Sequence, residues 1–208
     1  MQCVPHCRTA RITRVPFLFG LEKADLRSPA TNGSNEPIPT LKRCAKMTPA
    51  RKYEFRKASM SDLPTLLEWQ AQPHVREWWD SDEPYDQEEL SDPRVSRFVV
   101  SVEGRPFAFM QDYSVHGWED HHFAQLSKGA RGIDQYIGDP KMIGIGHGTA
   151  FIGARMRVLF DSGVPVIATD PHPDNERAIA VYTKLGFERS GWPQKTQWGC
   201  IIPMLARP

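Results

Sequence analysis

The sequence predicts a single α/β (α+β) domain, a mixed sheet flanked by helices, behind an extension of different character. The 208 residues are 40% hydrophobic and 25% charged, which suits one globular domain. Segments with a two-residue apolar period alternate along the chain with segments of helical period. The first 46 residues have neither period and contain five prolines, so the domain is expected to follow them.

Residues 1–46 are expected to be a disordered or non-native extension, and residues 47–208 the compact domain. The extension carries eight Lys and Arg against three Asp and Glu, whereas the domain carries eighteen against twenty-two. The apolar run VPFLFG is too short and too interrupted by proline for a signal peptide, and a basic targeting peptide is the alternative. No apolar run reaches the ~20 residues of a membrane span.

The first half of the domain should contain one helix, with room for a second, and three strands. Ser61 and Asp62 offer a cap before the apolar positions that begin at Leu63, and Pro64 is tolerated in a first helical turn. The expected strands are 52–58, 97–104 and 105–115, the last two joined by a hairpin turn at Glu103-Gly104.

The second half should alternate strands with two longer helices. Helix 147–163 has an apolar stripe and ends at Gly163, and helix 175–186 ends at Gly186. The expected strands are 132–138, 164–170, 187–192 and 198–205.

Three glycines, Gly144, Gly146 and Gly148, occupy alternate positions between a predicted strand and a predicted helix. Glycine lets an anion approach the backbone, and a helix N-terminus adds positive potential. The absence of a following Gly-Lys-Ser/Thr excludes a Walker loop, and the GxGxG spacing disfavours a dinucleotide fold. The loop therefore indicates the pyrophosphate of another cofactor, with a flexible turn as the alternative.

Two motifs together resemble the GNAT acetyltransferase family: IGIGHG (143–148) before a helix, and NERAIAVYTKLGF (175–187). Within that family EWW (77–79), RGIDQ (131–135) and TDPHPDN (169–175) are similar to aminoglycoside 6′-N-acetyltransferases. The similarity extends from about residue 53 to the C-terminus. It implies the GNAT fold, with a mostly antiparallel central sheet, and acetyl-CoA as co-substrate.

The resemblance assigns the cofactor pyrophosphate to the glycine loop and the helix start. The implied cofactor-binding residues are Ile143, Gly144, Ile145, Gly146, His147, Gly148, Thr149 and Asn175. The family's usual Gln or Arg at the start of the loop falls at Ile143, and the basic residue often found between the first two glycines falls at Ile145. Phosphate binding would then depend on backbone amides and the helix dipole. Asn175 is also predicted to cap its helix.

The resemblance also implies the catalytic pair, Asp134 and Tyr182. Transfer of acetyl from a thioester to an amine requires a deprotonated amine, donors for an oxyanion and a proton for the thiolate. Asp134 matches the acid of RGIDQ and is the predicted base, its pKa raised by apolar neighbours such as Ile133. Tyr182 matches the tyrosine near the cofactor sulfur and is the predicted acid. An aspartate bonded to a turn and an ordinary helical tyrosine are the structural alternatives.

Carboxylates and aromatic surfaces are expected to bind the acceptor. Residues 77–93 hold eight carboxylates and no Lys or Arg, a field that attracts cations and repels nucleic acid, unless they form only a solvated acidic loop. The predicted substrate-binding residues are Trp78, Trp79, Glu119, Asp120 and Asp170. The two tryptophans could stack on sugar rings, although one of them is expected to cover the core.

The expected activity is acetyl-CoA-dependent acetylation of a primary amine on a small cationic molecule, most specifically the 6′-amine of an aminoglycoside, by direct attack in a ternary complex. This implies a role in antibiotic resistance. A siderophore-type N-hydroxylysine acyltransferase, a protein N-terminal acetyltransferase and a non-catalytic acyl-CoA-binding module are the alternatives. The spacing of His116, His121 and His122 does not favour a metal site. A monomer or homodimer in the cytoplasm is expected, without nucleic-acid or membrane partners.

Overall fold

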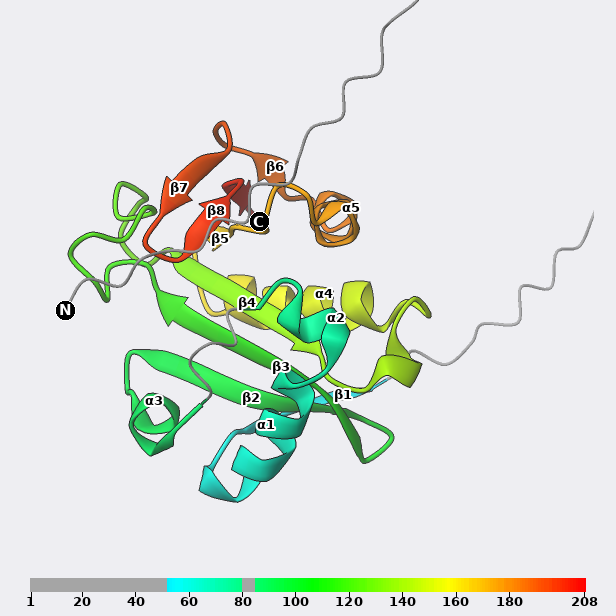
Figure 1. Ribbon diagram of the computed structural model, residues 1–208. Helices are drawn as coiled ribbons and strands as arrows, with labels where there is room; N and C mark the ends of the chain where they lie inside the picture. The colour runs from blue at the N-terminus through cyan, green and yellow to red at the C-terminus, as the bar shows by residue number, and fades with distance from the viewer. Residues whose placement is uncertain (1–51, 80–84) are drawn as a thin grey trace, which may run out of the picture. The chain divides into compact units, whose positions relative to one another are not determined.

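A seven-stranded sheet forms the centre of the computed structural model, which describes residues 52–79 and 85–208; the predicted extension 1–46 lies outside this range. The strand order is β1-β2-β3-β4-β5-β9-β6, and every neighbouring pair is antiparallel except β4 and β5 (Figure 1). The strands are β1 Tyr53–Lys57, β2 Val95–Val102, β3 Arg105–Ser114, β4 Arg131–Ile137, β5 Ile167–Thr169, β6 Glu188–Arg189 and β9 Met204–Ala206. The predicted class, a mixed and mostly antiparallel sheet flanked by helices, is confirmed.

Helices cover both faces of this sheet (Figure 1). Side chains alternate between the faces along each strand, so neighbouring residues enter different cores. On one face the strands pack against α4 (His147–Asp161) and α5 (Glu176–Lys184) in a cluster that includes Val100, Met110, Ile133, Phe151, Met156 and Tyr182. On the other face they pack against α1 (Leu63–Gln70) and α2 (Pro73–Arg76) in a cluster that includes Leu66, Trp69, Val75, Val99, Phe109 and Tyr136. None of the helices in the described ranges is long and apolar enough to cross a membrane.

The β2–β3 hairpin turns at the predicted position. Glu103 and Gly104 both have positive φ, 52° and 75°, which is the backbone of a two-residue hairpin turn. The register of this hairpin, continued into β4, places Arg97, Gln111 and Asp134 in one row across three strands. These three side chains therefore share one face of the sheet.

The parallel strands β4 and β5 remain paired over two positions only, Arg131 with Ile167 and Gly132 with Ala168. The Arg131 N–H donates to the Val166 carbonyl at 3.0 Å, which shows that this amide faces β5. Amides alternate in direction along a strand, so those of alternate residues after Arg131 face the same side, beyond the point where the two strands separate. The β5-facing edge of β4 therefore opens into a gap between the strands.

The later strands are shorter than their apolar runs predicted. The run 164–170 contains only β5, and the run 187–192 only β6. The run 198–205 is divided at Pro203, which has no amide to donate to a ladder, between β9 and strand β8 (Gly199–Ile201). Strand β8 pairs with β7 (Gln194–Thr196) in a separate hairpin.

The acidic stretch 77–93, predicted as a loop, contains the short helix α3 (Gln87–Ser91), and residues 80–84 lie outside the described ranges. Asp86 caps α3 by accepting a hydrogen bond of 2.8 Å from the Glu89 amide. The cap accounts for a helix in a segment that has too few apolar positions for a visible helical period.

A close contact between α1 and β4 leads to a test of the packing. A Cβ at Gly138 would lie 2.1 Å from the Trp69 ring, so Gly138→Ala must displace a buried indole. We expect this substitution to lower the free energy of unfolding by about 1–3 kcal/mol in urea titrations. Gly148→Ala, whose Cβ would meet only the Ile137 side chain at 3.9 Å, is the control and should not lower it. Equal unfolding free energies for the two variants would contradict this packing.

Candidate active site

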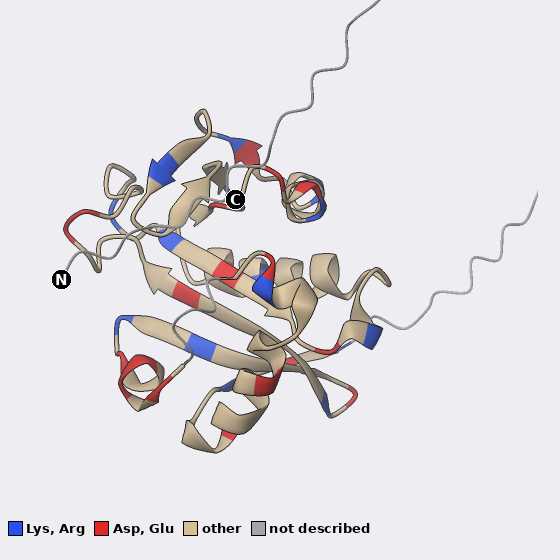
Figure 2. Ribbon diagram, viewed as in Figure 1, with Lys and Arg blue, Asp and Glu red and all other residues tan. Residues whose placement is uncertain are grey.

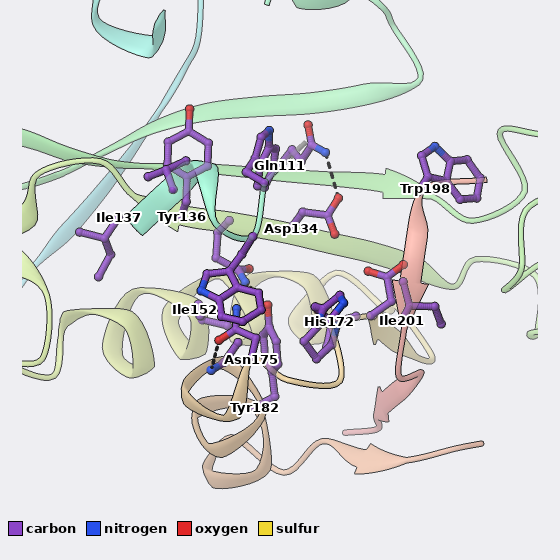
Figure 3. A pocket seen from close by; sticks show the side chains of 18 of the residues that line it. Gln111, Asp134, Tyr136, Ile137, Ile152, His172, Asn175, Tyr182, Trp198 and Ile201 are labelled. Carbon is purple, nitrogen blue, oxygen red and sulfur yellow. Dashed lines mark hydrogen bonds between the residues drawn. The ribbon is translucent and has the colours of Figure 1, made fainter. Parts of the chain in front are cut away.

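The gap between β4 and β5 is continuous with a cavity of about 990 Å³. Its described walls come from both sides of the sheet: α1 and α2, the central strands, the segment after β5, α5 and the β7–β8 hairpin (Figure 3). This volume lies at the upper end of the range for small-molecule sites. Side chains far apart in the sequence, such as those of Asp134 and Tyr182, meet here.

Asp134 lies on β4 with its carboxylate directed into the cavity (Figure 3). Gln111 Nε2 donates to its Oδ2 at 2.9 Å, and the Tyr113 hydroxyl is a second hydrogen-bond partner. Burial, together with the smaller effect of the negative charge of Asp170, raises the pKa of Asp134 to about 7, although both hydrogen bonds oppose the shift. A carboxyl group with this pKa exchanges a proton readily near neutral pH.

Tyr182 reaches the same cavity from α5 and is only 6% exposed. Its hydroxyl accepts a hydrogen bond from Gln135 Nε2. Burial raises the pKa of Tyr182 well above its usual value, while a hydrogen bond with Thr169 acts in the opposite direction. The phenol therefore keeps its proton at neutral pH and is held in place as a hydrogen-bond donor.

The exposed edge of β4 supplies a third element. By alternation from Arg131, the amides of Gln135 and Ile137 face the gap, and both residues line the cavity. The carbonyl of Ile137 is 2.8 Å from His74 Nε2 on α2, so this helix is attached to the end of the strand. A strand edge beside a gap offers backbone donors to an extended ligand or to a developing oxyanion.

The glycine loop leads from β4 to the start of α4. Gly144 and Gly146 have φ of 79° and 88°, and open space surrounds the position of a Cβ at each. Gly146 is the N-cap of α4 and has no side chain to cap it, so first-turn amides such as that of Gly148 can be offered to a ligand. Bare backbone at a helix N-terminus suits a phosphate, and the loop therefore fits the pyrophosphate group of coenzyme A.

The side chains of the predicted cofactor residues point in different directions, some into the cavity, one to solvent and one into the core. Ile143 and Gly148 line the cavity, and Ile145 is 53% exposed. The His147 ring is buried, its Nδ1 2.9 Å from the Tyr53 hydroxyl, so only the backbone of His147 remains available on the loop surface. Thr149 belongs to the first turn of α4.

Asn175 caps α5, as predicted. Its side-chain oxygen accepts a hydrogen bond of 3.0 Å from the Ala178 amide. The residue also lines the cavity, on the same wall as Tyr182. The cap fixes the start of α5 and with it the distance of the tyrosine from β4.

Acidic groups dominate the charge of the cavity, and Figure 2 shows acidic residues on the central strands. The carboxylates among its lining residues are Glu77, Glu89, Asp134, Asp170, Asp174 and Glu176, whereas the arginines are Arg97 and Arg177. Asp170 Oδ2 lies 2.8 Å from His122 Nε2, and Trp198 lies against the same histidine, with 5.5 Å between ring centroids. Such a cavity attracts cations.

The structure brings Trp78, Trp79 and Asp170 into the cavity but leaves Glu119 and Asp120 out of it. Trp79 packs edge-on against Phe109 and Tyr136 in the core, while Trp78 is 40% exposed. The division of roles expected for the two tryptophans, one of which covers the core, is therefore confirmed for Trp79.

Glu119 and Asp120 are exposed and do not line the cavity, so their prediction as substrate contacts is corrected here. The histidines that follow them, His121 and His122, stack at 4.6 Å between ring centroids and turn inward beside Phe123. From this segment it is the two histidine rings that line the cavity. The next residue, Phe123, is buried in an apolar cluster, which draws the histidines inward and leaves the two acids facing solvent.

The sequence did not assign the side chains of several lining residues, among them Gln111, Gln135, His172 and Trp198, although a backbone amide near Gln135–Gly138 or at the start of the loop was the expected oxyanion donor. The sequence contained a signal for Gln135, because this residue belongs to the RGIDQ motif and directly follows Asp134. On a strand its side chain points to the opposite face from that of Asp134. Gln111 had no such signal within its own segment. Only the β3–β4 register places it beside Asp134.

Comparisons with known proteins agree with this geometry. A family model described as an acetyltransferase (GNAT) domain matches residues 58–194. The chain belongs to the GNAT acetyltransferase family. It is therefore an N-acetyltransferase, and the predicted family and enzyme class are confirmed.

The chain is similar to two proteins of named function. The aminoglycoside N(6')-acetyltransferase type 1 of Klebsiella pneumoniae is 36% identical over 146 residues, 62% of this chain and 71% of the relative. A kanamycin resistance protein of Rhizobium radiobacter is 44% identical over 75 residues, 36% of this chain and 66% of that protein.

Solved structures point the same way. The aminoglycoside acetyltransferase AAC(6')-Ib, in complex with coenzyme A and kanamycin, has a TM-score of 0.67 and 34% identity, covering 75% of this chain and 95% of that one. A structure of AAC(6')-Ib with paromomycin and acetyl-CoA also has a TM-score of 0.67, at 33% identity, and covers 75% of this chain and 93% of that one.

The raised pKa of Asp134 predicts how stability depends on pH. The folded pKa of about 7 lies above the ordinary value of about 3.9, so the native state binds more protons than the unfolded state between these limits. The free energy of unfolding should therefore fall as pH rises from about 4 to about 7. Asp134→Asn should remove this fall and be more stable than the natural chain at pH 8, by on the order of 1–3 kcal/mol.

Urea titrations of the two proteins at pH 4.5 and pH 8 would measure this difference. Asp161→Asn, which changes an exposed carboxylate at the end of α4, is the matched control. A constant difference in stability between Asp134→Asn and the natural chain at both pH values would contradict the raised pKa.

Proposed function

We propose that this enzyme transfers the acetyl group of acetyl-CoA to the 6′-amine of an aminoglycoside, by direct attack in a ternary complex. The observation that supports this most directly is the meeting of Asp134, Tyr182 and the open edge of β4 in one acid-lined cavity. The relatives named above act on aminoglycosides or are solved with them. The glycine loop suits the pyrophosphate of the co-substrate, as its backbone geometry requires.

In this proposal Asp134 prepares the nucleophile. An alkylammonium group cannot attack until it loses a proton, and a carboxylate whose pKa is about 7 can take that proton at neutral pH. The attacking nitrogen then forms a bond to the thioester carbonyl carbon. Backbone donors on the gap edge of β4, such as the amides of Gln135 and Ile137, would stabilise the oxyanion that forms.

Tyr182 completes the reaction. When the carbon–sulfur bond breaks, the electron pair leaves on sulfur, and the phenol gives its proton to this thiolate. The nitrogen, now an amide, releases its second proton, which restores the phenol through the hydrogen-bonded groups around it. The products are an acetamide, free coenzyme A and one proton, which leaves from Asp134 to solvent.

The cavity favours an acceptor with several ammonium groups. Its lining residues include six carboxylates and two arginines, and Asp170 is close enough to disfavour the ionised form of Asp134. A cation between them lowers the cost of keeping both ionised, so a bound polyamine should lower the pKa of Asp134 toward its ordinary range. Charge-assisted hydrogen bonds of this kind contribute about 1.5–3 kcal/mol each.

The direct test is release of the coenzyme A thiol with kanamycin as acceptor, followed by NMR assignment of the acetylated nitrogen. We expect saturable turnover with kanamycin and acetylation at the 6′-amine. Spermidine, N-hydroxylysine and a peptide with a free N-terminus are the comparison acceptors. Coenzyme A binding without turnover of any acceptor would refute the proposal and support a binding module, and preferential turnover of N-hydroxylysine would support the siderophore-type reaction.

Substitution of the two proposed catalytic groups should separate chemistry from binding. Asp134→Asn should lower kcat by about 10²–10⁴-fold, because the amide cannot take a proton, while the Kd of coenzyme A stays unchanged. Tyr182→Phe should lower kcat by about 10²-fold. Steady-state kinetics and calorimetric titration with coenzyme A measure the two quantities, with Asp161→Asn as the control. Unchanged turnover in either variant would remove that residue from the mechanism.

A further inference from the structure

Arg97 is an unusual residue for a cavity that otherwise favours cations. It lies on β2, lines the cavity and is 8% exposed. Its Nη2 is 3.5 Å from Glu89 Oε1, but its Nε and Nη1 are buried and have no hydrogen-bond partner in the described part of the chain. Buried donors are seldom left unsatisfied, so these two atoms indicate a ligand or an ordered water.

A buried acceptor without a partner lies on the neighbouring strand. Gln111 is directly opposite Arg97 in the β2–β3 register, and both side chains line the cavity. The ionised carboxylate of Asp134 can only accept hydrogen bonds, so the Gln111 amide presents Nε2 to it and directs Oε1 away (Figure 3). That Oε1 is buried and has no partner among the described residues.

Unmet donors on Arg97 and an unmet acceptor on Gln111 define the chemistry that satisfies both. A hydroxyl group accepts from the guanidinium and donates to the amide oxygen. An ammonium group cannot accept and would be repelled by Arg97, and a carboxylate cannot donate to Gln111. Directly opposite residues have Cβ atoms about 4.5–5.5 Å apart, so the two side chains start from neighbouring positions on one face of the sheet, and both line the cavity.

We propose that Arg97 and Gln111 form a subsite for a hydroxyl group of the acceptor, on the same sugar ring as the amine that is acetylated. The inference rests on the proposed function, because Gln111 binds the proposed base directly. Gln111 binds the Asp134 carboxylate through Nε2, so a group that binds Oε1 of the same amide lies close to that carboxylate. The subsite would orient the ring by its hydroxyl while the carboxylates bind its ammonium groups.

Three acceptors that differ only in hydroxyl groups test this subsite: kanamycin B and its 3′-deoxy and 3′,4′-dideoxy derivatives. With the natural enzyme we expect kcat/KM to fall by about tenfold when the bound hydroxyl is removed, the effect of one hydrogen bond to a charged group. In Arg97→Met this ratio should fall most of the way toward one, because the hydroxyl has lost its charged partner and keeps only the neutral Gln111 oxygen. The KM of acetyl-CoA should not change.

Matched variants separate this role from a structural one. Arg97→Lys keeps the charge but loses the forked donors, so its ratio should lie between those of the natural enzyme and Arg97→Met. Arg56→Met removes an exposed arginine that is paired with Asp62, and it should keep the natural ratio. Thermal melting with coenzyme A present confirms that each variant is folded, and Arg97→Lys decides the question if Arg97→Met does not fold.

An unchanged ratio in Arg97→Met would overturn the subsite and leave an ordered water as the partner of Arg97. Equal kcat/KM values of the natural enzyme for all three acceptors would overturn it as well. If the natural enzyme acetylates none of them, the proposed function fails separately. In that case calorimetry tests the subsite: the Kd values of the three compounds should differ with the natural enzyme and differ less with Arg97→Met.

Discussion

The separation of two parallel strands determines most of what this structure can do. Strands β4 and β5 stay paired over two positions, after which the edge of β4 keeps its backbone groups but has no neighbouring strand there. Unsatisfied backbone donors in a protein interior are costly, so this opening is stable only beside solvent or a ligand. The separation also lets side chains from opposite faces of the sheet, such as those of Asp134 and Gln135, act in one cavity.

The acidity of this cavity has an energetic cost that the proposed mechanism uses. Burial of Asp134, together with the smaller effect of the negative charge of Asp170, raises the pKa of Asp134 to about 7. An ordinary carboxylate would be too weak a base at neutral pH to hold a proton taken from an ammonium group. In the proposed mechanism a bound cation offsets this cost, which links acceptor affinity to the ionisation of Asp134.

In the proposed reaction, backbone and side chains divide the recognition of the two substrates. The glycine loop and the edge of β4 offer main-chain amides, which suit a phosphate and a carbonyl oxygen. The rest of the cavity offers carboxylates, aromatic rings and the single row of Arg97, Gln111 and Asp134. In that row a cation, an amide and an acid follow one another across three strands, and the proposed hydroxyl subsite uses the first two of them.

The sequence by itself determined the elements whose signals are local. The Glu103-Gly104 turn, the Asn175 cap and the two longer helices follow from backbone conformation, capping and periodicity, and they appear where predicted. The motifs around Gly146, Asp134 and Tyr182 also indicated the family, because such residue spacing is a property of the chain. The short helix α3 and the division of the 198–205 run were missed because a cap and one proline outweighed the apolar pattern.

Only the tertiary structure decided which distant side chains meet. Gln111 stands beside Asp134 through strand register, and Glu119 lies outside the cavity because neighbouring rings pack inward in its place. Register and loop packing depend on contacts between residues far apart in the chain, and no local period records them.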